Sequence, residues 1–340
     1  MTILVTGACG YIGSHTLVDL IENGYDVVAV DNNSRSTTRL FEGVQKITGR
    51  KITLYNNDLC DFGKTREIFE KHDIKGIIHF AAFKSVDESV HSPLMYFQNN
   101  LISQINLLRC CEEFKVPNFV FSSSCSVYGN ADEIPVTEET PLKQAESPYG
   151  RTKQIGEDMI RDIARVSETK FVLLRYFNPV GAHPSVIIGE LPFGRPSNLI
   201  PAITQFAIGK LPALKVFGDD YDTRDGSCIR DFIHVCDIAR AHTLAIDYLV
   251  KKESVSNCEV LNLGTGNGVT VLEAIHAFEK VSGKKLSYTI AERRPGDIVA
   301  VYANNNKAKS LLGWNPRFKL EDMMSTAWAW EQVLSNYPDL

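Results

Sequence analysis

The chain has 340 residues, of which 44% are hydrophobic and 23% charged, as in an ordinary globular protein with a sizeable core. Its net charge of −5 argues against nucleic-acid and anionic-membrane partners, and no apolar run approaches the ~20 residues of a membrane helix. The eight cysteines lack C-x-x-C spacing and the histidines lack H-E-x-x-H spacing. We therefore expect no metal, reduced thiols and a cytoplasmic protein.

The first predicted element is an apolar strand over residues 3–5, which runs into a turn with Gly7, Gly10 and Gly13. A helical pattern follows to about residue 23, and then a second strand over 27–30 that ends in Asp31. This βαβ order fits a dinucleotide, because the glycines admit the pyrophosphate and an acid after the second strand binds the adenosine ribose. Asp31 favours NAD, while the nearby Arg35 and Arg39 keep NADP as an alternative. The competing interpretation is a Gly-rich turn that binds no nucleotide.

Further strands are predicted over residues 52–55, 76–82 and 119–124, alternating with helical stretches. This alternation predicts an α/β fold with a Rossmann-type, doubly wound parallel sheet. Ligands of such sheets lie beyond the carboxyl ends of the strands. Gly7, Asp31, Asp58, Phe80 and Ser124 all fall at such ends, so we expect them to converge on one site.

A Tyr and a Lys stand four residues apart in the segment Ser147-Pro148-Tyr149-Gly150-Arg151-Thr152-Lys153. In a helix they share one face, and the ammonium of Lys153 would lower the pKa of the Tyr149 phenol, which makes a general acid/base. Ser124, at the end of its strand, is a hydroxyl that can bond the same substrate oxygen. Taken alone, a Y-x-x-x-K spacing arises by chance in many helices, and a run of serines can be a solvated loop.

Several motifs together resemble the UDP-glucose 4-epimerase family of extended short-chain dehydrogenases/reductases. They are the G-x-x-G-x-x-G turn at 7–13, Ser122-Ser123-Ser124 with Val127-Tyr128-Gly129, the Tyr149/Lys153 pair, R-Y-F-N-P-V-G-A-H-P at 175–184, Gly264-Thr265-Gly266 and Leu311-Leu312-Gly313-Trp314. The resemblance implies that a bound NAD takes hydride from C4 of a UDP-hexose while Tyr149 removes the 4-hydroxyl proton. The 4-keto sugar then turns over and receives hydride on its other face. A homodimer is also implied.

The resemblance further implies a domain arrangement. Residues 1–178 would form the NAD-binding Rossmann domain. Residues 179–340 would form mainly a smaller C-terminal α/β domain for the UDP-sugar, with some segments returning to the Rossmann sheet.

The family pattern also assigns residues to each ligand. Cofactor contacts are expected from Gly7, Gly10, Tyr11, Ile12, Gly13, Asp31, Asn32, Ser36, Asp58, Leu59, Phe80, Ala81, Ala82, Lys84, Asn99, Ser122, Tyr149, Lys153, Tyr176 and Phe177. Substrate contacts are expected from Lys84, Ser124, Tyr149, Phe177, Asn178, Asn198, Leu199, Phe217, Arg230, Arg294, Asp297 and Val301. Arg230 and Arg294 suit the diphosphate, because a guanidinium is a planar, forked donor.

Val301 departs from the family members that carry a Tyr at this position. That Tyr crowds the sugar pocket, and members with a smaller residue also accept N-acetylated sugars. We therefore expect this chain to act on UDP-GlcNAc and UDP-GalNAc as well as on UDP-glucose and UDP-galactose. The neighbouring Tyr302 or a loop shift could instead refill the space.

Other functions remain open within the same fold. A 4,6-dehydratase needs an acid pair after the strand-end hydroxyl, and a UDP-glucuronate decarboxylase needs a Glu in that region, but Cys125 and Ser126 stand there. A non-catalytic, NAD-sensing protein is disfavoured by the intact Ser124, Tyr149 and Lys153.

Overall fold

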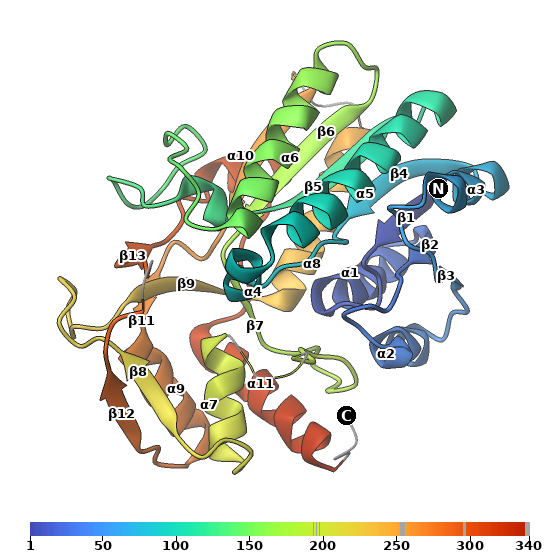
Figure 1. Ribbon diagram of the computed structural model, residues 1–340. Coiled ribbons are helices and arrows are strands. Elements are labelled where there is room, and N and C mark those ends of the chain that lie inside the picture. Colours follow the sequence, from blue (N-terminus) through green and yellow to red (C-terminus); the bar gives the residue numbers. More distant parts are fainter. Residues whose placement is uncertain (193, 195, 197, 252–255, 295–296, 337–340) are drawn as a thin grey trace.

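A seven-stranded sheet forms the centre of the molecule (Figure 1). The structure is a computed structural model that describes residues 1–192, 194, 196, 198–251, 256–294 and 297–336. The strand order is β3-β2-β1-β4-β5-β6-β10, and each neighbouring pair is parallel. The strands are β1 (Thr2–Thr6), β2 (Asp26–Val30), β3 (Thr53–Tyr55), β4 (Ile74–His79), β5 (Asn118–Ser124), β6 (Lys170–Tyr176) and β10 (Cys258–Leu263). The predicted doubly wound parallel sheet is thus confirmed.

Helices cover both faces of this sheet, which is why its central strands are apolar on both sides. In β5 every position is buried, and Val120 packs into one core while Phe119 and Phe121 pack into the other. One face carries α1 (Tyr11–Glu22), α2 (Thr38–Thr48), α8 (Val235–Val250) and α10 (Asn306–Leu312). The opposite face carries α3 (Phe62–Lys71), α5 (Pro93–Phe114) and α6 (Pro148–Ala164), with the short α4 (Val86–His91) leading into α5.

Strand β4 differs from its predicted span of 76–82, since it runs from Ile74 to His79. Beyond it the Phe80 amide still donates to the Thr6 carbonyl at 3.2 Å, and the backbone then passes the Gly-rich turn. A Cβ on Gly7 would lie 2.9 Å from the Ala81 nitrogen. The small residues at this point therefore mark the close crossing of two chain segments rather than a continuation of the sheet.

A smaller lobe lies beside the carboxyl end of the large sheet (Figure 1). Strand β9 (Ile229–His234) pairs with β7 (Asn178–Val180), β11 (Gly268–Thr270) and β13 (Ala300–Val301), and β8 (Leu214–Phe217) pairs with β12 (Tyr288–Ala291). Their apolar side chains share a core with α7 (Leu199–Ala207), α9 (Val271–Ser282) and α11 (Leu320–Ser335). The second half of the chain also supplies α8 and β10 to the large sheet. A functional boundary at residue 178 stays a prediction.

No helix within the described ranges is long and apolar enough to cross a membrane. All eight cysteines carry free thiols.

Candidate active site

The predicted residues of the first half gather at one edge of the large sheet. Gly7 follows β1, Asp31 follows β2 and Phe80 follows β4, while Ser124 and Tyr176 are the last residues of β5 and β6. Because the strands are parallel, their carboxyl ends meet along this edge, where ligands of doubly wound sheets bind.

The Gly-rich turn has the shape that a pyrophosphate needs. Gly7 adopts a left-handed φ of 67°, and a Cβ on Gly13 would lie only 2.2 Å from the Gly7 oxygen. Gly10 is the N-cap of α1 and makes no side-chain capping bond, and the first turn of α1 carries no acid. The helix thus presents its first N–H groups at this edge without a side chain across them, which suits an anion.

The Asp31 carboxylate is held beside this turn. Its Oδ2 accepts a hydrogen bond from the Cys9 amide at 2.9 Å, and its Oδ1 accepts from the Asn33 amide at 2.9 Å and the Ser36 hydroxyl at 2.8 Å. An acid fixed next to a phosphate-binding turn is placed to bind a ribose diol. The residues present therefore fit a dinucleotide.

Arg35 and Arg39, the two arginines that left NADP as an alternative cofactor, each contact other side chains of the protein. The Arg35 guanidinium forms an ion pair with Glu88 at 2.7 Å and lies 5.1 Å from the centre of the Phe83 ring. The Arg39 guanidinium lies 5.8 Å from the centre of the Trp330 ring. These contacts favour NAD over its 2′-phosphorylated form.

The other residues predicted at the cofactor follow the same edge. Tyr11, in the first turn of α1, donates its hydroxyl hydrogen to the Gly181 carbonyl at 2.5 Å and so links α1 to the segment after β7. The rest are Ile12 in α1, Asn32 and Ser36 after β2, Asp58 and Leu59 after β3, Ala81, Ala82 and Lys84 between β4 and α4, Asn99 in α5, Ser122 in β5 and Phe177 after β6.

The Tyr/Lys pair lies in the first turns of α6. The helix starts there because Pro148 occupies its first position and Ser147 is the N-cap, whose hydroxyl accepts from the Gly150 amide at 3.1 Å. Tyr149 and Lys153 are four residues apart and face the sheet edge. The Lys153 Nζ is buried, donates to the Ser122 carbonyl at 2.7 Å and lies 6.0 Å from the centre of the Tyr149 ring.

Burial dominates the acid-base properties of this pair. It raises the pKa of Tyr149 to about 12, although a hydrogen bond from the Ser124 side chain acts in the opposite direction. It lowers the pKa of Lys153 to about 8, against the charge of Glu157. The expected lowering of the Tyr149 pKa by Lys153 is thus not found in the protein alone, because the ammonium bonds a backbone carbonyl rather than the phenol.

The residues predicted to hold the diphosphate and uridine come together in the smaller lobe. Asp297 accepts from Arg294 at 3.1 Å and forms an ion pair with Arg230 at 3.5 Å. The Arg294 guanidinium lies 4.6 Å from the centre of the Phe217 ring. Val301 pairs in register with Arg230 and is buried.

Val301 also adjoins the catalytic edge. It packs in a small apolar cluster with Phe177, Tyr128 and Val127, and Cys125, which follows Ser124, packs against that cluster. Asn178 is the first residue of β7, which pairs with β9 at Phe232–His234, just beyond the residues that pair with β13. The two predicted groups of substrate residues are therefore joined through β9 and β13.

Glu190 is a site residue that sequence reasoning missed. It forms an ion pair with Lys84 at 3.6 Å and accepts from Asn198 at 3.1 Å, so it connects predicted residues of both halves. The Lys84 side chain is 65% exposed, whereas the Glu190 side chain is only 13% exposed. Asn198 and Leu199 mark the start of α7. No motif around Glu190 signals this role.

Within the described residues, no three His, Cys, Asp or Glu side chains form a group that could hold a metal ion. His79 and His234 lie in the protein interior, and burial lowers the pKa of His79 to about 3 and that of His234 to about 4.

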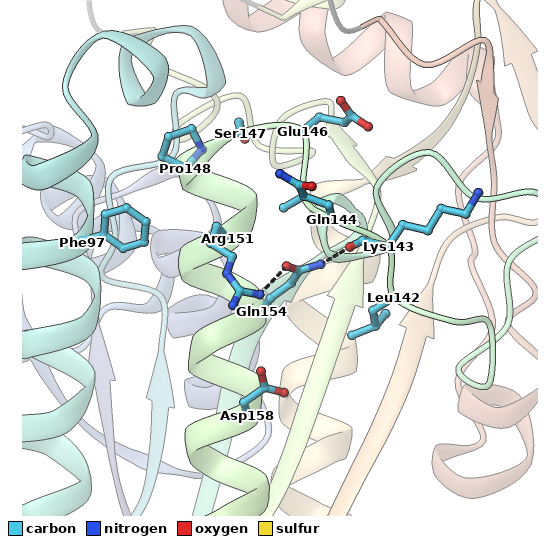
Figure 2. Close-up of a pocket in the computed structure, with 11 residues that line it drawn as sticks. Phe97, Leu142, Lys143, Gln144, Glu146, Ser147, Pro148, Arg151, Gln154 and Asp158 are labelled. Atoms are coloured by element: carbon cyan, nitrogen blue, oxygen red, sulfur yellow. Dashed lines mark hydrogen bonds between the residues drawn. The ribbon is translucent and has the colours of Figure 1, made fainter.

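A separate groove of about 750 Å³ lies on the outer side of α6 (Figure 2). Phe97 from α5 and Leu142 from the preceding loop line it, together with Pro148 and Asp158 from α6. Gln154 also lines it and donates to the Lys143 carbonyl at 2.6 Å. Tyr149 and Lys153 are not among the lining residues, so this groove is distinct from the catalytic edge.

Known proteins resemble the chain over almost its whole length. A family model described as GDP-mannose 4,6 dehydratase matches residues 4–327. The UDP-glucose 4-epimerase of Bacillus subtilis is 47% identical over 332 residues, which make up 97% of this chain and 97% of that protein.

Solved structures agree with this likeness. The UDP-glucose 4-epimerase of Bifidobacterium longum, in complex with NAD+ and UDP, is 43% identical with a TM-score of 0.94, and the match covers 99% of each chain. The UDP-Glc/GlcNAc 4-epimerase of Campylobacter jejuni is 38% identical with a TM-score of 0.84, over 98% of this chain and 99% of that one.

Proposed function

Because the chain belongs to the UDP-glucose 4-epimerase family of extended short-chain dehydrogenases/reductases, we propose that it interconverts UDP-glucose and UDP-galactose with NAD as its cofactor. One observation carries this proposal. Tyr149 lies beside Ser124, one helical turn from Lys153, on the same sheet edge as the Gly-rich turn and Asp31.

The Gly7–Gly13 turn would hold the pyrophosphate of NAD, and Asp31 would hold its adenosine ribose. Two things come from NAD when it is bound: hydride transfer from and to C4 of the sugar, and a positively charged nicotinamide ring. The protein's part is to move the 4-hydroxyl proton and to hold the sugar.

Tyr149 is the group that accepts the 4-hydroxyl proton and later returns it. Its pKa of about 12 makes the neutral phenol dominant in the protein alone, so the base forms only when positive charge accumulates beside it. Protonated Lys153 supplies part of that charge. Ser124, whose side chain acts to lower the pKa of Tyr149, stabilises the developing phenolate and the substrate oxygen.

Inversion requires the 4-keto sugar to present its other face, so the sugar must turn while the nucleotide stays bound. Arg230 and Arg294 would hold the diphosphate, as planar donors do, and Phe217 would contact the uridine. Asp297 orients both arginines. An anchor at the diphosphate leaves the hexose free to rotate beside Tyr149.

The test measures C4 inversion of UDP-galactose by the purified protein, with proton NMR as the readout. We expect turnover in the wild type. Tyr149→Phe should keep NAD in the protein and lose turnover by at least ~10²-fold, as expected for a lost general base. A Tyr149→Phe variant as active as the wild type would contradict the mechanism. A wild type that inverts no UDP-hexose, with NAD supplied, would contradict the function.

We also propose that the enzyme epimerises UDP-GlcNAc and UDP-GalNAc. The supporting observation is that Val301, a small side chain, packs in one apolar cluster with Phe177 and with residues that follow Ser124. A similar protein from Campylobacter jejuni is a UDP-Glc/GlcNAc 4-epimerase. Val301→Tyr should reduce kcat/KM for UDP-GalNAc by about 10-fold or more while largely preserving it for UDP-galactose. Equal losses on both substrates would contradict a selective role.

We propose that two copies of the chain pair through α4 and α5. Leu94 is 81% exposed, and Val90, Ile102 and Ile105 are further exposed apolar side chains along these helices. The groove of Figure 2 lies mainly between α6 and the loop before it and includes Phe97 of α5 in its lining. Sedimentation should give a dimer, and Leu94→Lys should shift it toward monomer. A monomeric wild type would contradict the proposal.

The eight free thiols fit a reducing compartment, and we place the enzyme in the cytoplasm.

A further inference from the structure

Glu157 is a fully buried carboxylate on the catalytic face of α6. It follows Lys153 by four residues, as Lys153 follows Tyr149, so the three side chains share one helix face. Its exposure is 0%, and that of Arg175, its partner on β6, is 1%. The reaction assigned above gives no task to either residue.

Four donors satisfy the Glu157 carboxylate. Oε1 accepts from Arg175 Nε at 2.9 Å and from the Ser123 hydroxyl at 2.5 Å. Oε2 accepts from Arg175 Nη2 at 2.6 Å and from Arg161 at 2.6 Å. Burial acts to raise the pKa of Glu157, but these bonds and charges outweigh it and lower the pKa. A charged carboxylate is therefore fixed inside the protein.

Arg175 is itself anchored on the far side. Its Nη1 donates to the Tyr128 hydroxyl at 3.0 Å, and Tyr128 donates to the Asn262 side chain in β10 at 2.6 Å. Glu157 is thus held by a network that reaches across β6 to β10, and it has little freedom to move.

Three consecutive serines of β5 meet this face of α6. Lys153 donates to the Ser122 carbonyl at 2.7 Å, the Ser123 hydroxyl donates to Glu157, and the side chain of Ser124 acts to lower the pKa of Tyr149. The bond from Ser123 to Glu157 therefore fixes the strand immediately before Ser124. The pairing of β5 with β6 fixes the backbone of these serines, and the Ser123–Glu157 bond adds a side-chain tie from β5 to α6 beside the Lys153 contact.

We propose that Glu157 is a positioning residue of the epimerase site: it aligns Ser124 with Tyr149 through Ser123, and its charge keeps Lys153 protonated. This inference rests on the proposed function, because it concerns the same proton transfer.

The titratable groups that face Lys153 single out Glu157 as the source of this charge. Tyr149 and Glu157 face it from α6, and His79 faces it from β4, with Tyr176 of β6 bonded to Ser122. Burial holds His79 neutral, with a pKa of about 3, and raises the pKa of Tyr149 and of Tyr176. Of these groups, only Glu157 is negative at neutral pH. Removal of the Glu157 charge should lower the pKa of Lys153 below its wild-type value of about 8.

The experiment compares pH profiles of kcat for UDP-galactose in the NAD-loaded enzyme. Turnover needs protonated Lys153, so kcat should fall at high pH as Lys153 loses its proton, and we call this part of the profile the alkaline limb. Glu157→Gln should move the alkaline limb to lower pH by about one unit. Ser123→Ala keeps the charge and removes the bond to β5. It should lower kcat about 10-fold with KM within about twofold and leave the limb in place. Glu157→Asp should restore the wild-type limb.

Asp237→Asn is the matched control, because Asp237 is also fully buried beside an arginine, Arg317, but lies away from the catalytic face. It should change the unfolding midpoint without moving the limb.

A folded Glu157→Gln enzyme with an unmoved limb would overturn the charge role, and an unchanged kcat in Ser123→Ala would overturn the alignment role. If Glu157→Gln does not fold, the other two variants test the proposal. In that case, a Glu157→Asp enzyme whose alkaline limb has moved to lower pH by about one unit would overturn the charge role, because this variant keeps the negative charge. An inactive wild type would instead refute the proposed function.

Discussion

At the scale of single residues, the cofactor edge depends on the absence of side chains. Gly7 and Gly13 lie so close that a Cβ on Gly13 would overlap the Gly7 oxygen. The contact lets the start of α1 approach the end of β1, and that approach sets where the N–H groups of α1 point. A methyl group at position 13 must therefore displace the turn rather than fill a void.

We predict that Gly13→Ala destabilises the protein by about 2 kcal/mol, as overpacking of a close contact does, and reduces the NAD retained after purification. Urea unfolding and the NAD content per chain measure the two effects. Gly63→Ala is the control, because its Cβ in α3 would meet only Asp61 Oδ1 at 3.4 Å. Similar losses in both variants would mean that the turn is not specially constrained.

At the scale of elements, α6 carries Tyr149, Lys153 and Glu157, so its start determines where all three lie. Ser147 is buried, and its hydroxyl satisfies the Gly150 amide, which has no partner within the helix. Tyr149 is the second residue of the helix. Fraying of this first turn would therefore move the catalytic phenol before it affected the rest of α6.

We predict that Ser147→Ala costs about 1 kcal/mol of stability and lowers kcat several-fold with a smaller change in KM. Thermal unfolding and steady-state kinetics on UDP-galactose provide the readouts. Thr37→Ala is the control, since Thr37 is the N-cap of α2 but makes no side-chain capping bond. We expect it to stay within about 0.5 kcal/mol of the wild type. A kcat unaffected by Ser147→Ala would show that Tyr149 does not depend on this cap.

The sequence predicted these elements better than it predicted their connections. Periodicity and the glycine spacing were enough for the parallel sheet and for the turn before α1, because both depend on local pattern. The Asp297 link between Arg230 and Arg294 and the contacts of Glu190 join distant segments, and no local pattern marks them. Glu157 did leave a signal, since it continues the four-residue spacing of Tyr149 and Lys153.

Electrostatic behaviour was harder to predict than position. A Lys one turn from a Tyr suggested a lowered phenol pKa, but the direction depends on burial and on where the ammonium donates its hydrogen bond. Only the folded chain reveals that Lys153 bonds the Ser122 carbonyl.

At the scale of the whole molecule, the core of the large sheet contains several buried histidines. His15 lies in α1, His79 in β4 and His242 in α8, and His234 is the N-cap of α8. Burial lowers the pKa of His15 and His79 to about 3, and that of His234 and His242 to about 4. The folded protein therefore keeps these rings neutral at pH values where an unfolded chain would protonate them.

This difference should make the fold sensitive to mild acid. Each folded pKa lies below the ordinary value of 6.5, so the contribution to stability is full above pH 6.5 and declines as the pH falls toward the folded values of about 3 for His15 and about 4 for His242. One such histidine contributes at most about 1.4 kcal/mol per pH unit over that range. We predict that the free energy of unfolding falls by several kcal/mol between pH 7.5 and pH 5.5, as measured by urea titration.

Carboxylates also contribute to acid unfolding, so the decisive measurement is a difference between variants. His242→Gln removes a ring whose Nε2 is buried without a hydrogen-bond partner, and it should reduce the loss between pH 7.5 and pH 5.5 by about 1 kcal/mol. His276→Gln, at an exposed position in α9, should retain the full loss. If both variants lose stability as steeply as the wild type, the buried rings do not titrate with unfolding, and the acid sensitivity must come from the carboxylates.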